Sequence, residues 1–267
     1  MSDILVRFVH VSDTHLHTDP TYIQRYASYT PLVGMQGFMK ALTALPFRPD
    51  FVLHTGDITY DPDPSVYAYA RDELAKFNLP LYYVRGNHDS SADIQRILMG
   101  RDDVMPMLNY TFDVNGVQFI VLDSNDPSQV TVPAGFVSAD QLAWLETLCT
   151  ADDPRPLVVA IHHNVIPTGA PWLDGYMRTA NGEDVHQILA KARDRLRGVF
   201  HGHIHQAIDQ LRDGVLYSAA ASAWCQFAAY PIPENTEVTE DRVSLPGFSV
   251  VAITKDSTYI RRHTFTV

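Results

Sequence analysis

Five short apolar segments of this sequence each end in side chains that commonly bind metal ions. Each segment is typical of a buried β-strand, because it is short, apolar and rich in β-branched residues. The residues that follow the five segments are Asp13 and His15; Asp57; Asn87 and His88; His162; and His203 and His205. Ligand sites of open α/β sheets gather beyond the carboxyl ends of the strands, so five separate loops could converge there. Shared by five strand ends, this pattern constrains both the fold and the function.

The order of the expected elements predicts an α/β fold. The expected strands are 5–11, 51–54, 81–84, 157–161 and a short one around 199–200. The expected helices are 34–45, 65–77, 91–99, 138–148 and 183–196. This βαβαβ start, followed by further α/β units, predicts a two-sheet α/β sandwich flanked by helices, with four layers in the order α-β-β-α.

Local turn and cap signals support this order. Asn115-Gly116 within the segment 110–123 suits a two-residue hairpin turn of positive φ. Ser138 with Gln141 three residues later forms a capping box that begins a helix. The end of the chain is expected to form strands at 207–211, 215–219, 248–253 and 259–265.

No clear linker divides the chain, so we expect a single domain over residues 1–267. The segment 219–246 is long, irregular and rich in aromatic residues and prolines. We expect it to act as a cap over a site or as an oligomerisation segment. A homo-oligomer is therefore one expected form of the protein.

The composition of the chain limits which classes of partner the protein can have. The formal charge of −11 argues against a nucleic-acid-binding surface, which normally carries a basic patch. No apolar stretch approaches the ~18 residues of a membrane span, and no signal peptide is visible at the start. The two cysteines, Cys149 and Cys225, lie far apart and are typical of reduced core thiols. We therefore expect a cytoplasmic protein with neither nucleic acid nor membrane as a partner.

The residue types of the five motifs indicate the metals. Carboxylate, amide oxygen and imidazole without thiolate favour Zn, Mn, Fe or Co and argue against structural zinc. Seven candidate ligands exceed what one ion needs, whereas two ions that share a bridging carboxylate would use them all. Such two-metal sites hold the attacking and leaving oxygens of a phosphoryl displacement. Two divalent ions, two aspartates and a hydroxide leave about one positive charge, which suits a phosphodiester monoanion.

The same residues resemble the calcineurin-like metallophosphoesterase superfamily. The similarity rests on Asp13-x-His15, Gly56-Asp57, Gly86-Asn87-His88-Asp89, His162 and Gly202-His203-x-His205, in this order. The resemblance implies that Asp13, His15 and His205 bind one metal ion. It implies that Asn87, His162 and His203 bind a second ion and that Asp57 bridges the two. It also implies that His88 either donates a proton to the leaving alkoxide or stabilises the phosphorane-like charge, and that a metal-bound hydroxide is the nucleophile.

A narrower resemblance, to class III cyclic-nucleotide phosphodiesterases and bacterial glycerophosphodiesterases, concerns the substrate. It rests on His162-His163 followed by Pro167-Thr-Gly, on Gly202-His-Ile-His-Gln206 and on Ala221-Ser-Ala-Trp-Cys-Gln-Phe227. It implies hydrolysis of a small phosphodiester, with a 3',5'-cyclic nucleotide as first choice. The alternatives are a glycerophosphodiesterase or broad phosphodiesterase and, least favoured, a metal-binding scaffold without turnover. Asn164, Val165 and His201 depart from the family pattern and weaken the substrate prediction more than the reaction.

Several neighbouring residues are predicted to be structural. His163 is expected to pack or hydrogen-bond beside the site without binding metal, and His186 to lie at the surface of its helix. Asp89 is expected to cap a helix or orient a histidine. A cluster of tyrosines either lines a substrate cleft or packs the first loop: Tyr22, Tyr26 and Tyr29. The sequence leaves the roles of His17 and His201 open.

Overall fold

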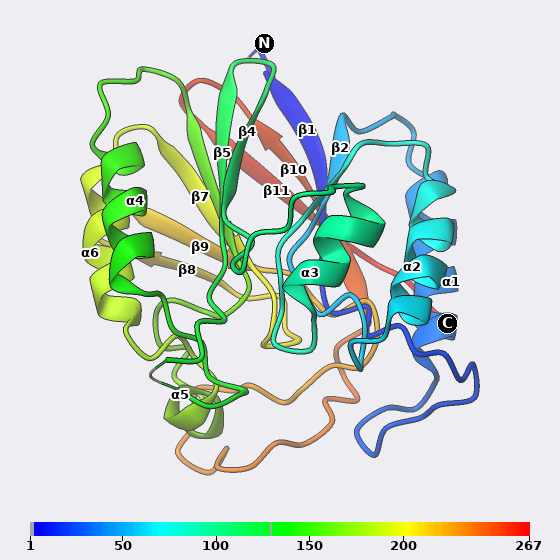
Figure 1. Cartoon of the computed structure of the whole chain (residues 1–267). Coiled ribbons are helices and arrows are strands. Elements are labelled where there is room, and N and C mark those ends of the chain that lie inside the picture. Colours follow the sequence, from blue (N-terminus) through cyan, green and yellow to red (C-terminus); the bar gives the residue numbers. More distant parts are fainter. Residues whose placement is uncertain (1–2, 129) are drawn as a thin grey trace.

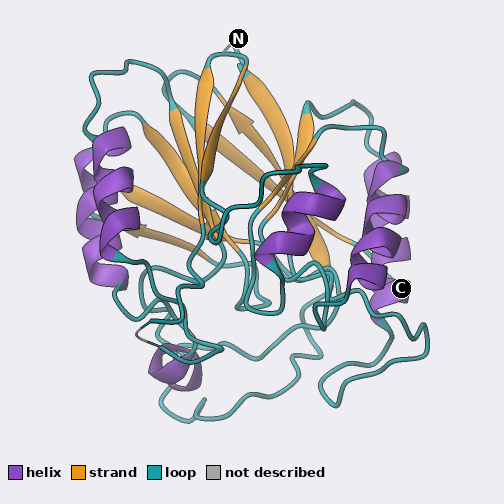
Figure 2. Cartoon of the chain, viewed as in Figure 1, coloured by secondary structure: helices purple, strands orange, loops and turns teal. Residues whose placement is uncertain are grey.

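Two β-sheets pack against each other between two layers of helices (Figures 1 and 2). The computed structural model describes residues 3–128 and 130–267. One sheet has five strands in the order β11-β10-β1-β2-β3, and the other has six in the order β4-β5-β6-β7-β9-β8. The predicted two-sheet α/β sandwich is thus confirmed.

The first sheet is built from two βαβ crossovers and a C-terminal hairpin. Its strands are β1 (Val6–Val11), β2 (Phe51–His54), β3 (Leu81–Tyr83), β10 (Gly247–Ile253) and β11 (Thr258–Thr264). Its helices are α1 (Pro31–Thr43), α2 (Pro64–Ala75) and α3 (Ser91–Asp93), which continues as a π-helical turn, Ile94–Leu98. The crossovers make β1, β2 and β3 parallel, so the loops that follow these strands leave from the same edge.

The second sheet has parallel strands in its middle and an antiparallel pair at each end. Its strands are β4 (Tyr110–Val114), β5 (Val117–Leu122), β6 (Leu157–Ile161), β7 (Leu196–His201), β8 (Asp209–Arg212) and β9 (Val215–Ala219). Its helices are α4 (Ala139–Cys149), α5 (Pro171–Tyr176) and α6 (Gly182–Lys191). Because β6 and β7 are parallel neighbours, the loops after them also share one edge.

Aromatic side chains hold the two sheets together. Phe8 of β1 stacks on Phe51 of β2 with ring centroids 5.1 Å apart, and it meets Phe119 and Phe200 of the second sheet edge-on. All four rings are buried. Two further apolar clusters fill the spaces between each sheet and its own helices, which explains the four layers.

The local signals that act within a few residues were predicted well. Asn115 and Gly116 have positive φ at the tip of the β4–β5 hairpin, as a two-residue turn requires. The capping box of Ser138 and Gln141 begins α4.

The predicted helix over 183–196 was too long, because α6 ends at Lys191 and β7 already begins at Leu196. Leu196 is buried as the first residue of a strand, which an apolar helical pattern does not distinguish from one more helical turn. The short helix α5 lies where only a loop was expected.

The surface position predicted for His186 was wrong. This residue of α6 has a fully buried side chain. Its Nδ1 lies 2.7 Å from the Tyr217 hydroxyl, and its Nε2 lies 2.9 Å from Asp213 Oδ2. Both ring nitrogens have a polar partner, so the free-energy cost of burying the imidazole is offset by hydrogen bonds. The histidine is thus a structural link between α6 and the β8–β9 hairpin.

Candidate metal centre

The loops that follow β1, β2, β3, β6 and β7 meet at one edge of the sandwich, the lower edge in Figure 1. The structure brings all seven predicted ligands together there, three loops coming from the first sheet and two from the second. The carboxylate and imidazole members are all at least nine-tenths buried, although they are polar. Buried polar groups need partners, so the distances between these side chains decide what the cluster can hold.

The first group consists of Asp13, His15 and His205. The Nε2 atoms of His15 and His205 are 3.1 Å apart. Asp13 Oδ1 lies 3.3 Å from His205 Nε2 and 3.9 Å from His15 Nε2. One ligand atom from each residue therefore points toward a common centre.

The second group consists of Asn87, His162 and His203. His162 Nε2 lies 3.1 Å from Asn87 Oδ1, and the rings of His162 and His203 are 5.0 Å apart between centroids. Asp57 lies between the two groups, since its Oδ2 is 3.6 Å from His15 Nε2 and 3.4 Å from His162 Nε2. The position of this carboxylate is that of a ligand shared by two ions.

Backbone carbonyl groups hold the outer nitrogens of four imidazoles. The contacts are His162 Nδ1 to Thr55 O (2.7 Å), His205 Nδ1 to Cys225 O (2.7 Å), His203 Nε2 to Met177 O (2.9 Å) and His88 Nδ1 to Tyr60 O (2.6 Å). A carbonyl oxygen only accepts, so each of these nitrogens carries the hydrogen. The inner nitrogen of each neutral ring then presents a lone pair to the cluster.

His15 differs from these rings, because its buried Nδ1 has no hydrogen-bond partner among the described residues.

The direction in which the lone pairs of the cluster point fits bound cations. With the outer nitrogens donating, the inner lone pair of His162 faces the oxygens of Asn87 and Asp57, and that of His205 faces Asp13. Acceptors that face one another in a buried place need a proton or a metal ion between them. The donor set of nitrogen and oxygen atoms suits transition-metal ions.

The pKa shifts in the metal-free cluster also indicate that this place favours positive charge. Burial opposes the charged form of His162, but Asp57, Asp13 and the Thr55 carbonyl together outweigh it and raise the pKa of His162 to about 9. Burial is likewise outweighed at His205, where Asp13 raises the pKa of the imidazole well above its usual value. In turn, these imidazoles hold the pKa of both carboxyl groups below their usual range, against the effect of burial. Protons and metal ions therefore compete for this cluster.

Backbone strain is concentrated at the same residues. Eight non-glycine residues of the described chain have positive φ, and five of them are predicted ligands: Asp13, His15, Asp57, His203 and His205. Positive φ is uncommon for residues with a Cβ and is retained where the surrounding structure requires it. The tight turns at the strand ends therefore aim these side chains into the cluster at a conformational cost.

His88 lies at the open side of the cluster. Its backbone N–H donates to Asp57 Oδ1 at 2.9 Å, and its ring meets the ring of His15 edge-on, 4.9 Å between centroids. Because Nδ1 is held by Tyr60, Nε2 is the atom available to a bound molecule. The resemblance implies a role for His88 in proton transfer, and this role stays a prediction.

His163 is a structural neighbour of the cluster. His163 lies beside His162 and His203, but its Nδ1 contacts Ser124 Oγ at 2.7 Å and its Nε2 contacts Pro133 O at 3.0 Å. Neither nitrogen is then free for a metal, in agreement with the prediction.

Asp89 is not a helix cap, because Ser90 caps α3. Its carboxylate instead accepts hydrogen bonds from the backbone N–H groups of Ile58, Thr59 and Gly86 and so joins two of the ligand loops.

A pocket of about 210 Å³ opens over the cluster. Candidate metal ligands and aromatic side chains make up most of its lining. No lysine or arginine is among the described residues that line it. Among the described lining residues, the fixed charges are thus those of the cluster itself.

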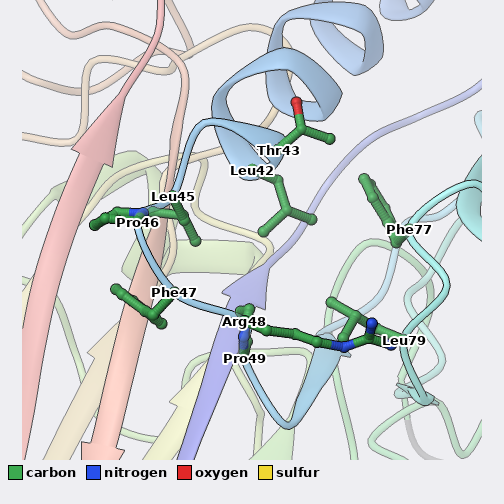
Figure 3. Close-up of a pocket in the computed structure, with 9 residues that line it drawn as sticks. All are labelled: Leu42, Thr43, Leu45, Pro46, Phe47, Arg48, Pro49, Phe77 and Leu79. Carbon is green, nitrogen blue, oxygen red and sulfur yellow. The ribbon is translucent and has the colours of Figure 1, made fainter.

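A larger pocket of about 370 Å³ lies elsewhere, between the ends of α1 and α2 (Figure 3). The segment 46–49 that lines it precedes β2, so it lies at the amino ends of the strands, away from the cluster. Its lining is apolar apart from Thr43 and Arg48 and contains no acid or histidine, so it offers no chemistry for the candidate reaction.

Several relatives match nearly the whole chain. A family model described as calcineurin-like phosphoesterase matches residues 6–207. A Pseudomonas aeruginosa protein named 3',5'-cyclic adenosine monophosphate phosphodiesterase is 30% identical over 92% of this chain and 85% of its own length. The Escherichia coli protein of the same name is 28% identical over 95% of this chain and 87% of its own. A Nostoc protein named 3',5'-cyclic-nucleotide phosphodiesterase is 26% identical over 95% of this chain and 90% of its own.

Solved structures agree in fold. A dimetal phosphatase from Danio rerio superposes with a TM-score of 0.63 and 14% identity, covering 99% of this chain and 100% of its own. GAP50, described as an anchor in the inner membrane complex of Plasmodium, superposes with a TM-score of 0.62 and 14% identity, covering 99% of this chain and 90% of its own. At such identities the likeness shows the fold alone, and here the fold is shared by a phosphatase and an anchor. The function must therefore be argued from the site.

Proposed function

This chain belongs to the calcineurin-like phosphoesterase family, and we propose that it is a metal-dependent phosphodiesterase that hydrolyses a 3',5'-cyclic nucleotide. The reaction would add water across one phosphoester bond and release a phosphomonoester whose sugar carries the freed hydroxyl. The relatives named above support the substrate class, and the buried cluster of seven ligands supports the reaction.

The charge of the pocket is the observation that carries the choice of a diester. With two divalent ions, Asp13, Asp57 and a hydroxide, the site would hold about one excess positive charge. No lysine or arginine adds to this charge among the described lining residues. A diester carries one negative charge and matches the site, whereas a monoester dianion would leave a buried charge without a partner.

We assign the ligands as two sets that share one carboxylate. Asp13, His15 and His205 would hold one ion, Asn87, His162 and His203 the other, and Asp57 would bridge them. The identity of the metals, Mn, Fe, Zn or Co, belongs to this proposal. Ions bound there would polarise the phosphoryl oxygens and lower the pKa of water, which makes a nucleophile available near neutral pH.

The protein itself supplies orientation and a proton. Tyr60 O accepts from the His88 Nδ1–H and fixes the ring, and in its doubly protonated form His88 would donate the Nε2 proton to the leaving alkoxide as the bond of the alkoxide to phosphorus breaks. The amide oxygen of Asn87 adds a ligand without adding negative charge, which leaves the site attractive to an anion. Backbone carbonyl groups keep the ligand imidazoles in one orientation, so little reorganisation is needed when substrate binds.

A glycerophosphodiesterase or a broad phosphodiesterase is the alternative, because the ligand set determines the reaction and leaves the alcohol open. A scaffold without turnover is less favoured, since all seven ligands are present and lie together in one cluster. We also propose a cytoplasmic location, which agrees with two free, buried cysteines. No helix in the part of the chain that the structure describes combines the length and apolar character needed to cross a membrane.

The test is a metal analysis of the purified protein followed by a substrate panel. We expect about two metal ions per chain and hydrolysis of bis(p-nitrophenyl) phosphate and cyclic AMP, with slower hydrolysis of a phosphomonoester. Asp57→Ala and Asn87→Ala should abolish hydrolysis while circular dichroism stays that of the wild type. Protein that is inert toward every diester with Mn, Zn, Fe and Co would refute the proposal.

A further inference from the structure

Three segments far apart in the sequence place aromatic rings at the mouth of the pocket over the metal cluster. Tyr26 comes from the loop after β1, Tyr176 from the end of α5, and Phe227 from the segment 219–246. In Figure 1 all three lie below the sandwich, with α5 at the lower left, the loop after β1 at the lower right and the segment 219–246 between them. The tyrosine cluster thus divides, because Tyr26 lines the pocket whereas the hydroxyl of Tyr29 donates to Trp224 O.

Two of the rings continue from the metal cluster, and Tyr176 lines the same pocket. Phe227 stacks on the imidazole of His205, with centroids 4.1 Å apart and planes within 10°. Tyr26 meets Phe227 edge-on, with centroids 6.0 Å apart. All three rings keep solvent-accessible surface, and Tyr176 is 53% exposed although it is large and mostly apolar. Aromatic surface left uncovered beside a site is typical of a place where a ligand stacks.

From these rings we infer that Tyr26, Tyr176 and Phe227 form a subsite for the nucleobase of the substrate. The inference rests on the proposed phosphodiesterase function and adds that these aromatic residues, not the metal ligands, select a nucleotide over a glycerophosphodiester. A base is planar and neutral, and stacking on an aromatic side chain contributes enough to matter, roughly tenfold or more in affinity.

A donor for the edge of the base is also present. Gln24 lines the same pocket, and its Oε1 accepts a hydrogen bond from the backbone N–H of Tyr26 at 3.3 Å. Its NH2 group is therefore the part that can donate to a ring nitrogen or carbonyl of a base. A set of rings with one amide donor suits a nucleobase better than an alkyl chain.

A quaternary ammonium group, such as the choline of a glycerophosphodiester, also binds to aromatic rings. Here the guanidinium of Arg25 already lies over the ring of Tyr26, 4.4 Å from its centroid. A second cation at this ring would be repelled, whereas a neutral base would not. The subsite therefore favours the nucleotide.

The experiment compares Tyr26→Leu with wild type on cyclic AMP and on glycerophosphocholine. Among the described residues no hydrogen bond or ring pair joins Tyr26 to a candidate ligand, so its loss should act through substrate binding. We expect kcat/KM for cyclic AMP to fall about tenfold or more relative to that for glycerophosphocholine, chiefly through KM. Tyr26→Phe keeps the ring and should keep the ratio, and Tyr259→Leu, an exposed tyrosine of β11, serves as the distant control.

A second readout is inhibition of the hydrolysis of bis(p-nitrophenyl) phosphate, a diester without a nucleobase. AMP and ribose 5-phosphate carry the same phosphate group, so the ratio of their inhibition constants reports the contribution of the base. Wild type should prefer AMP, and Tyr26→Leu should lose that preference. An unchanged ratio in both assays would overturn the base subsite, and an equal fall for glycerophosphocholine would replace it with a cation site. Absence of all diester hydrolysis in wild type would instead refute the proposed function.

Discussion

Gly86 illustrates how a single residue controls the metal cluster. A Cβ at this position would overlap the backbone nitrogen and the carboxylate of Asp57, the proposed bridging ligand. A glycine that permits close approach of two backbones is needed here because the β2 and β3 loops converge at one point. A residue without a side chain is therefore needed at this position because the neighbouring loop lies so close. Gly86 does not need the positive φ of a tight turn.

We expect Gly86→Ala to lower kcat/KM on a diester by about 100-fold or more, because displacement of a reacting group by about 1 Å has effects of this order. Metal content should fall with it. Gly175→Ala is the matched control, since a Cβ there meets nothing within 4 Å. Retention of full metal content and activity by Gly86→Ala would contradict the assigned bridging role of Asp57.

The buried histidine His54 should make the protein sensitive to acid. Its Nδ1 accepts from the Gly56 N–H at 3.3 Å and its Nε2 lies 3.0 Å from Thr14 Oγ1, so the ring is neutral in the fold. Burial lowers the pKa of His54 from 6.5 to about 4. Because the folded pKa lies below the unfolded one, the stability from the neutral ring is complete above pH 6.5 and is lost as the pH falls toward about 4.

Between pH 8 and pH 5 this residue should therefore lower the free energy of unfolding by about 2 kcal/mol. Urea unfolding of the metal-free protein at both pH values measures it. His54→Gln should show a pH dependence smaller by about that amount, since the other titrating groups are common to both proteins. An NMR titration that gives His54 a pKa near 6.5 in the folded protein would contradict the expectation.

At the scale of secondary-structure elements, caps and turns were predictable because they depend on neighbours in sequence. In the α4 capping box the Ser138 N–H donates to Gln141 Oε1 at 3.0 Å, and Gln141 N donates to Ser138 Oγ at 3.4 Å. Both bonds satisfy donors that a helix start leaves unpaired. The element boundary is thus set locally, far from the chemistry.

Ser138→Ala should lower stability by about 1 kcal/mol, which corresponds to a fall of roughly 2–4 °C in the melting temperature. Hydrolysis of a diester should stay at the wild-type rate. Ser138→Asp restores an oxygen that can accept from the helix N–H groups and should recover most of the loss. A melting temperature unchanged in Ser138→Ala would show that tertiary contacts alone determine the start of α4.

At the scale of the whole molecule, the metal cluster joins the two sheets. Loops from β1, β2 and β3 supply four of the proposed ligands, and loops from β6 and β7 supply three. An ion that binds the folded state and not the unfolded one adds about 2.7 kcal/mol of stability at a concentration 100 times its dissociation constant. Metal should therefore stabilise the sandwich as well as enable the reaction.

Removal of metal by a chelator should abolish hydrolysis and lower the melting temperature by several degrees, and added Mn²⁺ or Zn²⁺ should restore both. Asp57→Asn serves as the control, because a protein with a weakened bridging ligand should respond less to the same treatment. A metal-free protein with unchanged melting temperature and activity would rule out the role assigned to the cluster.

The assignment of one domain to residues 1–267 and the oligomeric state stay predictions. For the segment 219–246 the structure adds that Trp224, Cys225, Phe227 and Val238 line the pocket of their own chain. Its expected role as a cap over a site therefore gains support from contacts within one chain.

The sequence by itself determined which side chains stand at which strand ends. Short apolar runs that stop at Asp13, Asp57 or His162 are local patterns, and parallel strands bring their ends to one edge by topology. For the same reason the strands 51–54, 157–161 and 215–219 have in the structure the bounds expected from the sequence. The convergence of the ligands could thus be expected before the structure was known.

Only the tertiary structure decided what surrounds those ligands. The carbonyl groups of Thr55, Met177 and Cys225 that orient the imidazoles leave no trace in the sequence, because every residue has a carbonyl. The burial of His186 and the aromatic contacts of Phe227 depend on segments that are distant along the chain and meet only after the sheets have packed. Periodicity reports which face of an element is apolar, but it does not report which distant segment will cover that face.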